Sequence, residues 1–175
     1  MCGIVGVAGD IGMKEREIFQ DLLLICQLRG QDSTGAIRVS NQNDVAFHKM
    51  VGPHDVILDS RKYTAKIDSY NSKVLVGHCR AKTNGAINVA NAHPFDFDNV
   101  IGVHNGTLDF SWRRGQDAKE FDVDSEWLYS RINVLGVGEA ISNEVSEDGA
   151  WALVFWDKVK NTLNFLRNKK RPLRS

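Results

Sequence analysis

Residues 1–9 read MCGIVGVAG, and this stretch decides how the chain begins its fold. From Cys2 to Ala8, small residues alternate with β-branched ones, which predicts a buried strand. Cys2 follows the initiator Met1 directly, and its side chain is small enough for Met1 to be removed. The product would carry a free α-amine beside its own thiol. Cys2 is therefore either a packed strand residue or a nucleophile whose own amine serves as the base.

The other elements follow from hydrophobic periodicity and turn residues. Residues 53–70 are ambiguous, because Pro53 could begin a helix that runs to residue 68. Strands clustered at both ends, with helices between them, favour an α+β sandwich of layered sheets with helices outside. One helix is predicted at 14–28, where the apolar residues have helical spacing: Ile18, Leu22, Ile25, Cys26 and Leu28. A second helical segment is predicted over most of 117–141, where DVDSEWLYSRI (122–132) offers an acidic N-terminal cap. Strands are predicted at 36–40, 45–50, 73–79, 99–106, 149–157 and 162–166, with a hairpin turn at 41–44.

Length and composition indicate one soluble globular domain spanning residues 1–175. The formal net charge is zero, so no long-range field favours nucleic acid or an anionic membrane, and a small-molecule substrate or a protein partner is expected. No apolar run approaches the ~20 residues that span a bilayer, and no secretory signal is recognisable. Three widely spaced cysteines do not form a disulfide framework, which indicates a cytoplasmic setting, and Cys26 and Cys79 are expected to pack as small hydrophobes.

His78, Cys79, His93 and His104 are residue types that bind metals. Adjacent residues of a strand point to opposite faces, so His78 and Cys79 cannot easily share one ion. The chain also has no C-x-x-C or H-x-x-x-H pair. We expect no metal site, and we expect the histidines to be hydrogen-bonded to neighbouring loops.

The segment GHCRAKTNG (77–85) places Arg80 just past the end of a predicted strand, in a loop with Thr83. A lone arginine is usually a solvated surface charge. Here a guanidinium, a hydroxyl and backbone donors together suit a carboxylate ligand.

Two further segments carry weaker signals. HNG (104–106) is either a simple turn or a pair of donors for an oxyanion, from the Asn105 amide and the Gly106 N–H. DVDSE (122–126) supplies carboxylates at a helix start, where capping is the plainer explanation.

Six motifs occur in one order along the chain: CGIVG, RGQDSTG, GHCRAKTNG, NAHPF, VHNGTL and DVDSE. With this order the chain resembles the class II, or N-terminal nucleophile (Ntn), glutamine amidotransferase domain. The similarity runs from Cys2 to about Pro172, and the style of the motifs is most like that of the small stand-alone members. The resemblance implies a four-layer αββα sandwich with two antiparallel sheets.

The resemblance also implies a mechanism that needs no cofactor, with L-glutamine as the substrate. The Cys2 thiol would attack the side-chain amide of glutamine, and the freed Cys2 amine would act as the base. By analogy, Asn105 and Gly106 form the oxyanion hole, Arg80 holds the α-carboxylate, Asp124 holds the α-ammonium, and Thr83 helps to seat the same end. Arg29, Asp32, His78, His93 and His104 are assigned supporting positions around these groups.

The chain departs from the family pattern in two places. An aromatic residue often follows the loop arginine and helps to gate ammonia passage, but this chain has Ala81 and Lys82 there. The difference weakens the case for an internal ammonia channel and leaves the glutaminase chemistry unaffected. The end of the chain, RNKKRPLRS (167–175), resembles an arginine–proline–leucine element after which relatives usually continue. The domain is therefore minimal, shortened, or completed by a partner.

The leading hypothesis is an enzyme that hydrolyses glutamine and passes ammonia to an acceptor enzyme on another chain, or releases it. One alternative is a catalytically inactive binding module that keeps the fold. Another is an Ntn hydrolase of a different amide, such as a γ-glutamyl compound. The sequence leaves the oligomeric state open.

Overall fold

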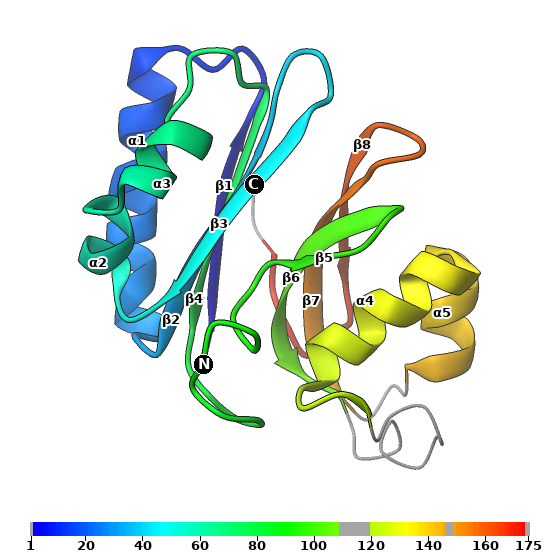
Figure 1. Ribbon diagram of the computed structural model, residues 1–175. Helices are drawn as coiled ribbons and strands as arrows, with labels where there is room; N and C mark the ends of the chain where they lie inside the picture. Colours follow the sequence, from blue (N-terminus) through cyan, green and yellow to red (C-terminus); the bar gives the residue numbers. More distant parts are fainter. Residues whose placement is uncertain (1, 109–119, 146–148, 174–175) are drawn as a thin grey trace. The chain divides into compact units, whose positions relative to one another are not determined.

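The computed structural model describes residues 2–108, 120–145 and 149–173, and the chain divides into two compact units. The first unit contains Met1–Lys82 and Ile87–Pro94, and the second contains Thr83–Ala86 and Phe95–Ser175. Each unit has a four-stranded antiparallel sheet and its own helices (Figure 1).

In the first unit the strand order is β1-β4-β2-β3, so the N-terminal strand lies at one edge of the sheet and pairs with β4. Adjacent strands β2 and β3 form a hairpin, with Asn43 at φ 72° in the connecting turn. The strands are β1 (Gly3–Ala8), β2 (Ser33–Val39), β3 (Val45–Val51) and β4 (Val74–Arg80), and the helices are α1 (Met13–Cys26), a 3₁₀ turn (Gln27–Arg29), α2 (His54–Leu58) and α3 (Arg61–Lys66).

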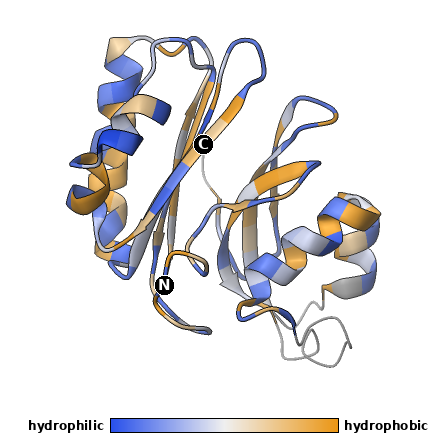
Figure 2. Ribbon diagram, viewed as in Figure 1, coloured by the Kyte–Doolittle hydropathy of each residue, from blue (hydrophilic) through white to orange (hydrophobic). Residues whose placement is uncertain are grey.

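The face with which helix α1 packs on the sheet matches the predicted one only in part: Cys26 is buried as predicted, but most of the other predicted positions are not. Its buried residues are Arg16, Phe19, Leu23 and Cys26, whereas the predicted positions Ile18, Ile25 and Leu28 are 42%, 62% and 82% exposed. The helix carries apolar residues on two sides, because Phe19 and Leu23 are buried while Ile18 and Ile25 are exposed. Figure 2 shows hydrophobic and hydrophilic residues mixed along α1. Phe19 and Leu23 lie over Gly77 of β4, where the missing side chain leaves room for them. Periodicity alone could not choose between the two faces.

The segment after Pro53 is helical, but it forms two short helices. Helix α2 ends at Leu58, and α3 begins at Arg61. A helix thus does begin after Pro53, as the ambiguous segment allowed, but it does not run unbroken to residue 68.

In the second unit the strand order is β5-β6-β7-β8. Its core brings Trp127, Leu128 and Tyr129 of α4 against Leu153 and Phe155 of β7. The strands are β5 (Phe95–Asp96), β6 (Val100–Thr107), β7 (Ala150–Asp157) and β8 (Thr162–Arg167), and the helices are α4 (Asp124–Leu135) and α5 (Val137–Glu144).

Strand β5 was not predicted, because its two residues are too few to form an alternating pattern. The stretch 117–141 is mostly helical in its described part, as predicted, but it forms two helices, α4 and α5, that separate at Gly136. Within the described residues helix α4 starts at Asp124, with Val123 at the N-cap, and residues 117–119 lie outside them. The α+β class and the two antiparallel sheets are confirmed. In the described part of the chain, no helix is both long and apolar enough to cross a bilayer.

Candidate active site

Cys2 lies directly before β1, at the edge of the first sheet. In the β1–β4 ladder Gly3 pairs with Cys79, so one further step along the same register brings Cys2 beside Arg80. A side chain at Gly3 would collide with the sulfur of Cys26 on α1, so position 3 faces the helix. Because neighbouring strand residues face opposite ways, Cys2 and Arg80 lie on the face away from α1.

The Cys2 thiol is held against the segment that follows β4. Its sulfur donates to the carbonyl oxygen of Ala81 at 3.4 Å and accepts from the Ala81 N–H at 3.4 Å. The backbone carbonyl of Cys2 accepts a hydrogen bond from Nε of Arg29 at 2.9 Å. These contacts fix the residue from both its side chain and its main chain.

Arg80 is the last residue of β4 and is only 4% exposed. The prediction that it follows the strand in a loop is therefore wrong. The β2 strand extends to Ser33, and Ser33 pairs with Arg80, which keeps position 80 within the sheet. A guanidinium fixed at a strand end has a better-defined direction than one on a loop.

The RGQDSTG segment (29–35) packs against the end of β4. A Cβ at Gly30 would lie 2.3 Å from the carbonyl carbon of Arg80, so only glycine allows this approach. The backbone N–H of Asp32 donates to the Arg80 carbonyl at 3.0 Å, and its carboxylate accepts from the Lys82 N–H at 2.7 Å. Asp32 therefore orders the loop that touches the Cys2 thiol.

His78 and His93 are both buried in the first unit, with ring centroids 4.0 Å apart. Cys79 faces the other way, because its sulfur donates to the Leu23 carbonyl of α1 at 3.7 Å. The prediction that neighbours 78 and 79 point to opposite faces is confirmed. A hydrogen bond with Cys26, together with burial, raises the pKa of the Cys79 thiol well above its usual range. Cys79 is therefore a packed thiol.

Metal-binding residue types do not cluster in the part of the chain that the structure describes: no group of three or more histidine, cysteine, aspartate or glutamate side chains there could hold an ion.

Asn105 and Gly106 lie inside β6 of the second unit, where they pair with Ala152 and Trp151 of β7. The strand predicted over 99–106 is confirmed, and of the two alternatives for HNG the simple turn is excluded. Gly106 has φ +153°. Asn105 is half-buried, and within the described residues its side chain makes no hydrogen bond, so its amide is available as a donor. An Asn-Gly pair usually indicates a turn, but here β7 continues the ladder past it.

Asp124 begins α4 and is 4% exposed. Its carboxylate accepts from the backbone N–H of Leu108 at 2.9 Å and from that of Ser125 at 2.9 Å. The N-cap itself is Val123, so a side-chain acidic cap is not formed. Asp124 instead ties the end of β6 to the start of α4.

His104 is 1% exposed, and its Nδ1 lies 2.8 Å from the hydroxyl oxygen of Ser125. Burial lowers the pKa of His104, the charge of Arg171 lowers it further, and the Asp124 carboxylate opposes the shift. The imidazole is therefore neutral in the folded protein near pH 7.

This lowered pKa predicts a pH dependence of stability. In the unfolded chain His104 binds a proton near pH 6.5. The unfolded state then holds more protons than the folded state, so the free energy of unfolding should fall as the pH drops from about 7 towards 5, by at most about 1.4 kcal/mol per pH unit for this group. Urea titrations of the His104→Asn variant should show a shallower pH dependence than those of the unaltered chain. Identical slopes would contradict the assignment.

Thr83 lies in an exposed segment after β4, and its side chain makes no hydrogen bond with the described residues. Its predicted role thus has no support from contacts. The first unit holds Cys2, Arg29, Asp32, His78, Arg80 and His93, and the second holds Thr83, His104, Asn105, Gly106 and Asp124.

Sequence reasoning missed Lys49 of β3, whose ammonium binds carbonyls of the loop 90–94 within the first unit. A signal was present, because Lys49 stands in the same alternating set as Val45, Phe47 and Val51.

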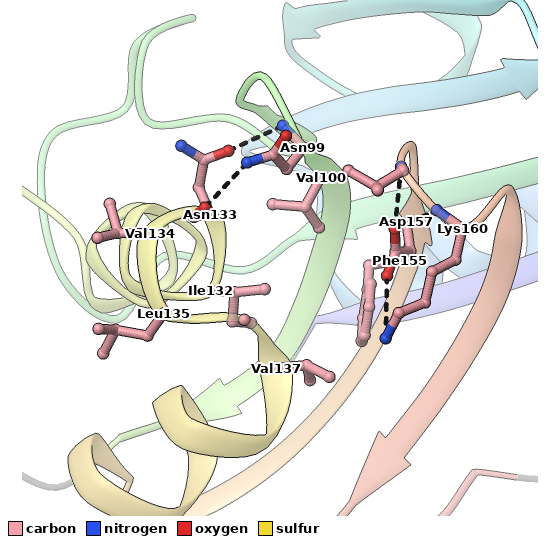
Figure 3. Close-up of a pocket in the computed structure, with 12 residues that line it drawn as sticks. Asn99, Val100, Ile132, Asn133, Val134, Leu135, Val137, Phe155, Asp157 and Lys160 are labelled. Atoms are coloured by element: carbon pink, nitrogen blue, oxygen red, sulfur yellow. Dashed lines mark hydrogen bonds and ion pairs between the residues drawn. The ribbon is translucent and has the colours of Figure 1, made fainter.

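A separate cavity of about 300 Å³ lies at the C-terminal end of α4 (Figure 3). Apolar side chains such as Ile132 and Phe155 line it. On its rim the side chain of Asn99 donates to the carbonyl of Asn133 at 3.1 Å. None of the candidate site residues predicted from the sequence lines this cavity.

No protein-family model matches the chain. Curated relatives do match it. Glutamine–fructose-6-phosphate aminotransferase (isomerizing) from Shouchella clausii is 32% identical over an alignment of 186 residues. This alignment covers 99% of this chain and 30% of the relative. The enzyme of the same name from Zymomonas mobilis is 34% identical over 118 residues, or 62% of this chain and 17% of the relative. Amidophosphoribosyltransferase from Escherichia coli is 32% identical over 111 residues, or 62% of this chain and 21% of the relative.

The chain is homologous to class II glutamine amidotransferase domains. It spans between 17% and 30% of the length of these three relatives, so it corresponds to one part of each of them. The resemblance seen in the ordered motifs is thereby confirmed.

Proposed function

We propose that this chain hydrolyses the side-chain amide of L-glutamine with Cys2 as the nucleophile and delivers the ammonia to an acceptor. The observation that carries the proposal is the position of the Cys2 thiol, held against Ala81 and beside Arg80 on one face of the sheet. Homology to glutamine-dependent amidotransferases supports the substrate.

The chemistry requires that Met1 is removed. The α-amine of Cys2 then takes the thiol proton, and the sulfur attacks the side-chain carbonyl carbon of glutamine. The carbonyl π electrons move to oxygen. When the tetrahedral intermediate collapses, the Cys2 ammonium gives its proton to the departing amide nitrogen, so that the C–N bond breaks and ammonia leaves. Water, activated by the same amine, cleaves the γ-glutamyl thioester to release glutamate and restore the thiol.

Glutamine is a zwitterion, so its site must offer one cation and one anion. Arg80 is proposed to bind the α-carboxylate through its planar fork of donors. Asp124 is proposed to bind the α-ammonium, and Thr83 to contact the same end. Holding both ends positions the amide for attack, which converts binding energy into rate.

The oxyanion of the intermediate needs donors that are in place before the reaction. The Asn105 side-chain amide and the Gly106 N–H are proposed for this role. Arg29 and Asp32 would act one layer further out, since the first holds the Cys2 carbonyl and the second holds the Arg80–Lys82 segment.

The ammonia acceptor is proposed to be an enzyme on a separate chain. The activity is proposed to operate in the cytoplasm. It is proposed to need no cofactor, because the thiol and amine of Cys2 supply the nucleophile and the base.

The direct test measures glutamate and ammonia from L-glutamine, with L-asparagine and γ-glutamyl anilide as parallel substrates. Equal amounts of glutamate and ammonia from L-glutamine, with little turnover of the other two, are expected. A preference for the anilide would favour a different Ntn hydrolase. No turnover of any substrate by chain that has lost Met1 would overturn the proposal.

A further inference from the structure

Lys49 on β3 holds one loop of the first unit through its main chain. Its ammonium donates to the carbonyl oxygens of Ala92 at 2.7 Å, Pro94 at 3.1 Å and Ala90 at 3.2 Å. These three carbonyls belong to alternate residues of the segment 90–94, which overlaps the NAHPF motif (91–95). Three loop carbonyls converge on this one ammonium, so the loop conformation depends on the Lys49 side chain.

The strand register shows where this loop is anchored. Lys49 pairs with Gly35, and Gly35 pairs with His78, so the three form one row across the sheet. A Cβ at Gly35 would lie 2.0 Å from the His93 carbonyl oxygen, which shows that the loop rests directly on this glycine. The His93 ring then packs on His78 at 4.0 Å. Lys49, Gly35 and His78 thus form the floor for loop 90–94.

The next row of the same sheet face contains Arg80. Ser33 of β2 pairs with Arg80 of β4. On the other side of β4, continuing the β1–β4 register by one residue places Cys2 opposite Arg80. Ser33 lies two residues from Gly35 on β2, and Arg80 lies two residues from His78 on β4. The two rows are therefore about 6.6 Å apart along the strands. The loop that Lys49 fixes therefore rests on the row next to that of Arg80, on the same face of the sheet.

We propose, on the basis of the proposed function above, that Lys49 is a positioning residue for glutamine capture. It fixes loop 90–94 so that His93 buttresses His78, and this row supports Arg80 at the α-carboxylate position. Lys49 touches neither the thiol nor any reacting atom. Its removal weakens binding of the amino-acid end of the substrate and leaves the reactivity of the Cys2 thiol intact.

The test compares two alkylating agents at Cys2. 6-Diazo-5-oxo-L-norleucine carries the glutamine α-amino and α-carboxylate groups, whereas iodoacetamide carries neither. In Lys49→Met, the second-order rate of labelling by the diazoketone should fall by at least about tenfold, the size expected when hydrogen bonds to a charged group are lost. The iodoacetamide rate should be unchanged. Lys49→Arg should recover part of the diazoketone rate, because it restores the charge and several donors.

A matched control is Lys158→Met in the second unit. Lys158 also binds a carbonyl, that of Phe97, and the Asp96 carboxylate, both at 2.6 Å. This variant should keep both labelling rates. Glutamine turnover should show the same split, with KM raised in Lys49→Met and kcat nearly retained.

Other results would overturn the inference. An unchanged diazoketone rate in Lys49→Met would show that the loop does not support binding. An equal fall of both rates, or a fall in Lys49→Arg as large as in Lys49→Met, would reduce Lys49 to a structural role. If Lys49→Met does not fold, Lys49→Gln is judged by the same two rates. Failure of the unaltered chain to react with the diazoketone at Cys2 would be a failure of the proposed function itself.

Discussion

Replacing Cys2 with alanine is expected to lower glutamate release from glutamine by a factor on the order of 10⁴ or more, because no other group can form the thioester. Alanine is as compatible with removal of Met1 as cysteine is, so the variant isolates the thiol from the amine. The measurement is the initial rate of glutamate formation, with intact mass recorded for both proteins.

The matched control for this prediction is Cys26→Ala. Cys26 is 3% exposed at the end of α1 and has no proposed role in the reaction. Its replacement should cost some stability and leave kcat close to that of the unaltered chain. Full activity in Cys2→Ala, or the same loss in both variants, would contradict the assignment of the nucleophile.

The second large effect is expected from Asn105→Ala, which should lower kcat by about 10²–10³-fold with little change in KM. The amide is proposed to bind the oxyanion, which exists only in the transition state and the intermediate. Loss of such a donor therefore slows the chemical step without weakening substrate binding. Steady-state kinetics with glutamine measure both constants.

Asn164→Ala on β8 provides the comparison for that experiment. Asn164 belongs to the same sheet, and its amide donates within its own strand, to Thr162. This variant should retain kcat. A rise in KM alone in Asn105→Ala would instead place the amide at the binding end of the substrate.

Much of the fold could be predicted from local patterns. The strands around Gly3–Ala8, Val45–Val51 and Ala150–Asp157 follow from alternation and turn residues, which act within a few positions of the chain. The exposed face of α1 could not be predicted, because both of its sides carry apolar residues and the choice depends on Gly77 of a distant strand. The two residues of β5 are set by pairing with β6 and leave almost no local signal.

The site divides in the same way. The ordered motifs singled out Cys2, Arg80, Asn105 and Asp124. Local rules put Arg80 in a loop and left Asn105 open between a turn and an oxyanion donor. Both residues belong to strands because a neighbouring strand continues beside them. The role of Lys49 depends on three carbonyls about forty residues further along the chain, and no spacing rule finds such contacts. The single-domain extent of the chain stays a prediction.

The most direct test of the central claim is peptide mass mapping after treatment with 6-diazo-5-oxo-L-norleucine. We predict a chain that lacks Met1 and carries one adduct, on the sulfur of Cys2, with excess glutamine protecting it. An adduct on Cys26 or Cys79, or an unlabelled Cys2 in chain that has lost Met1, would contradict the claim that Cys2 is a nucleophile for glutamine.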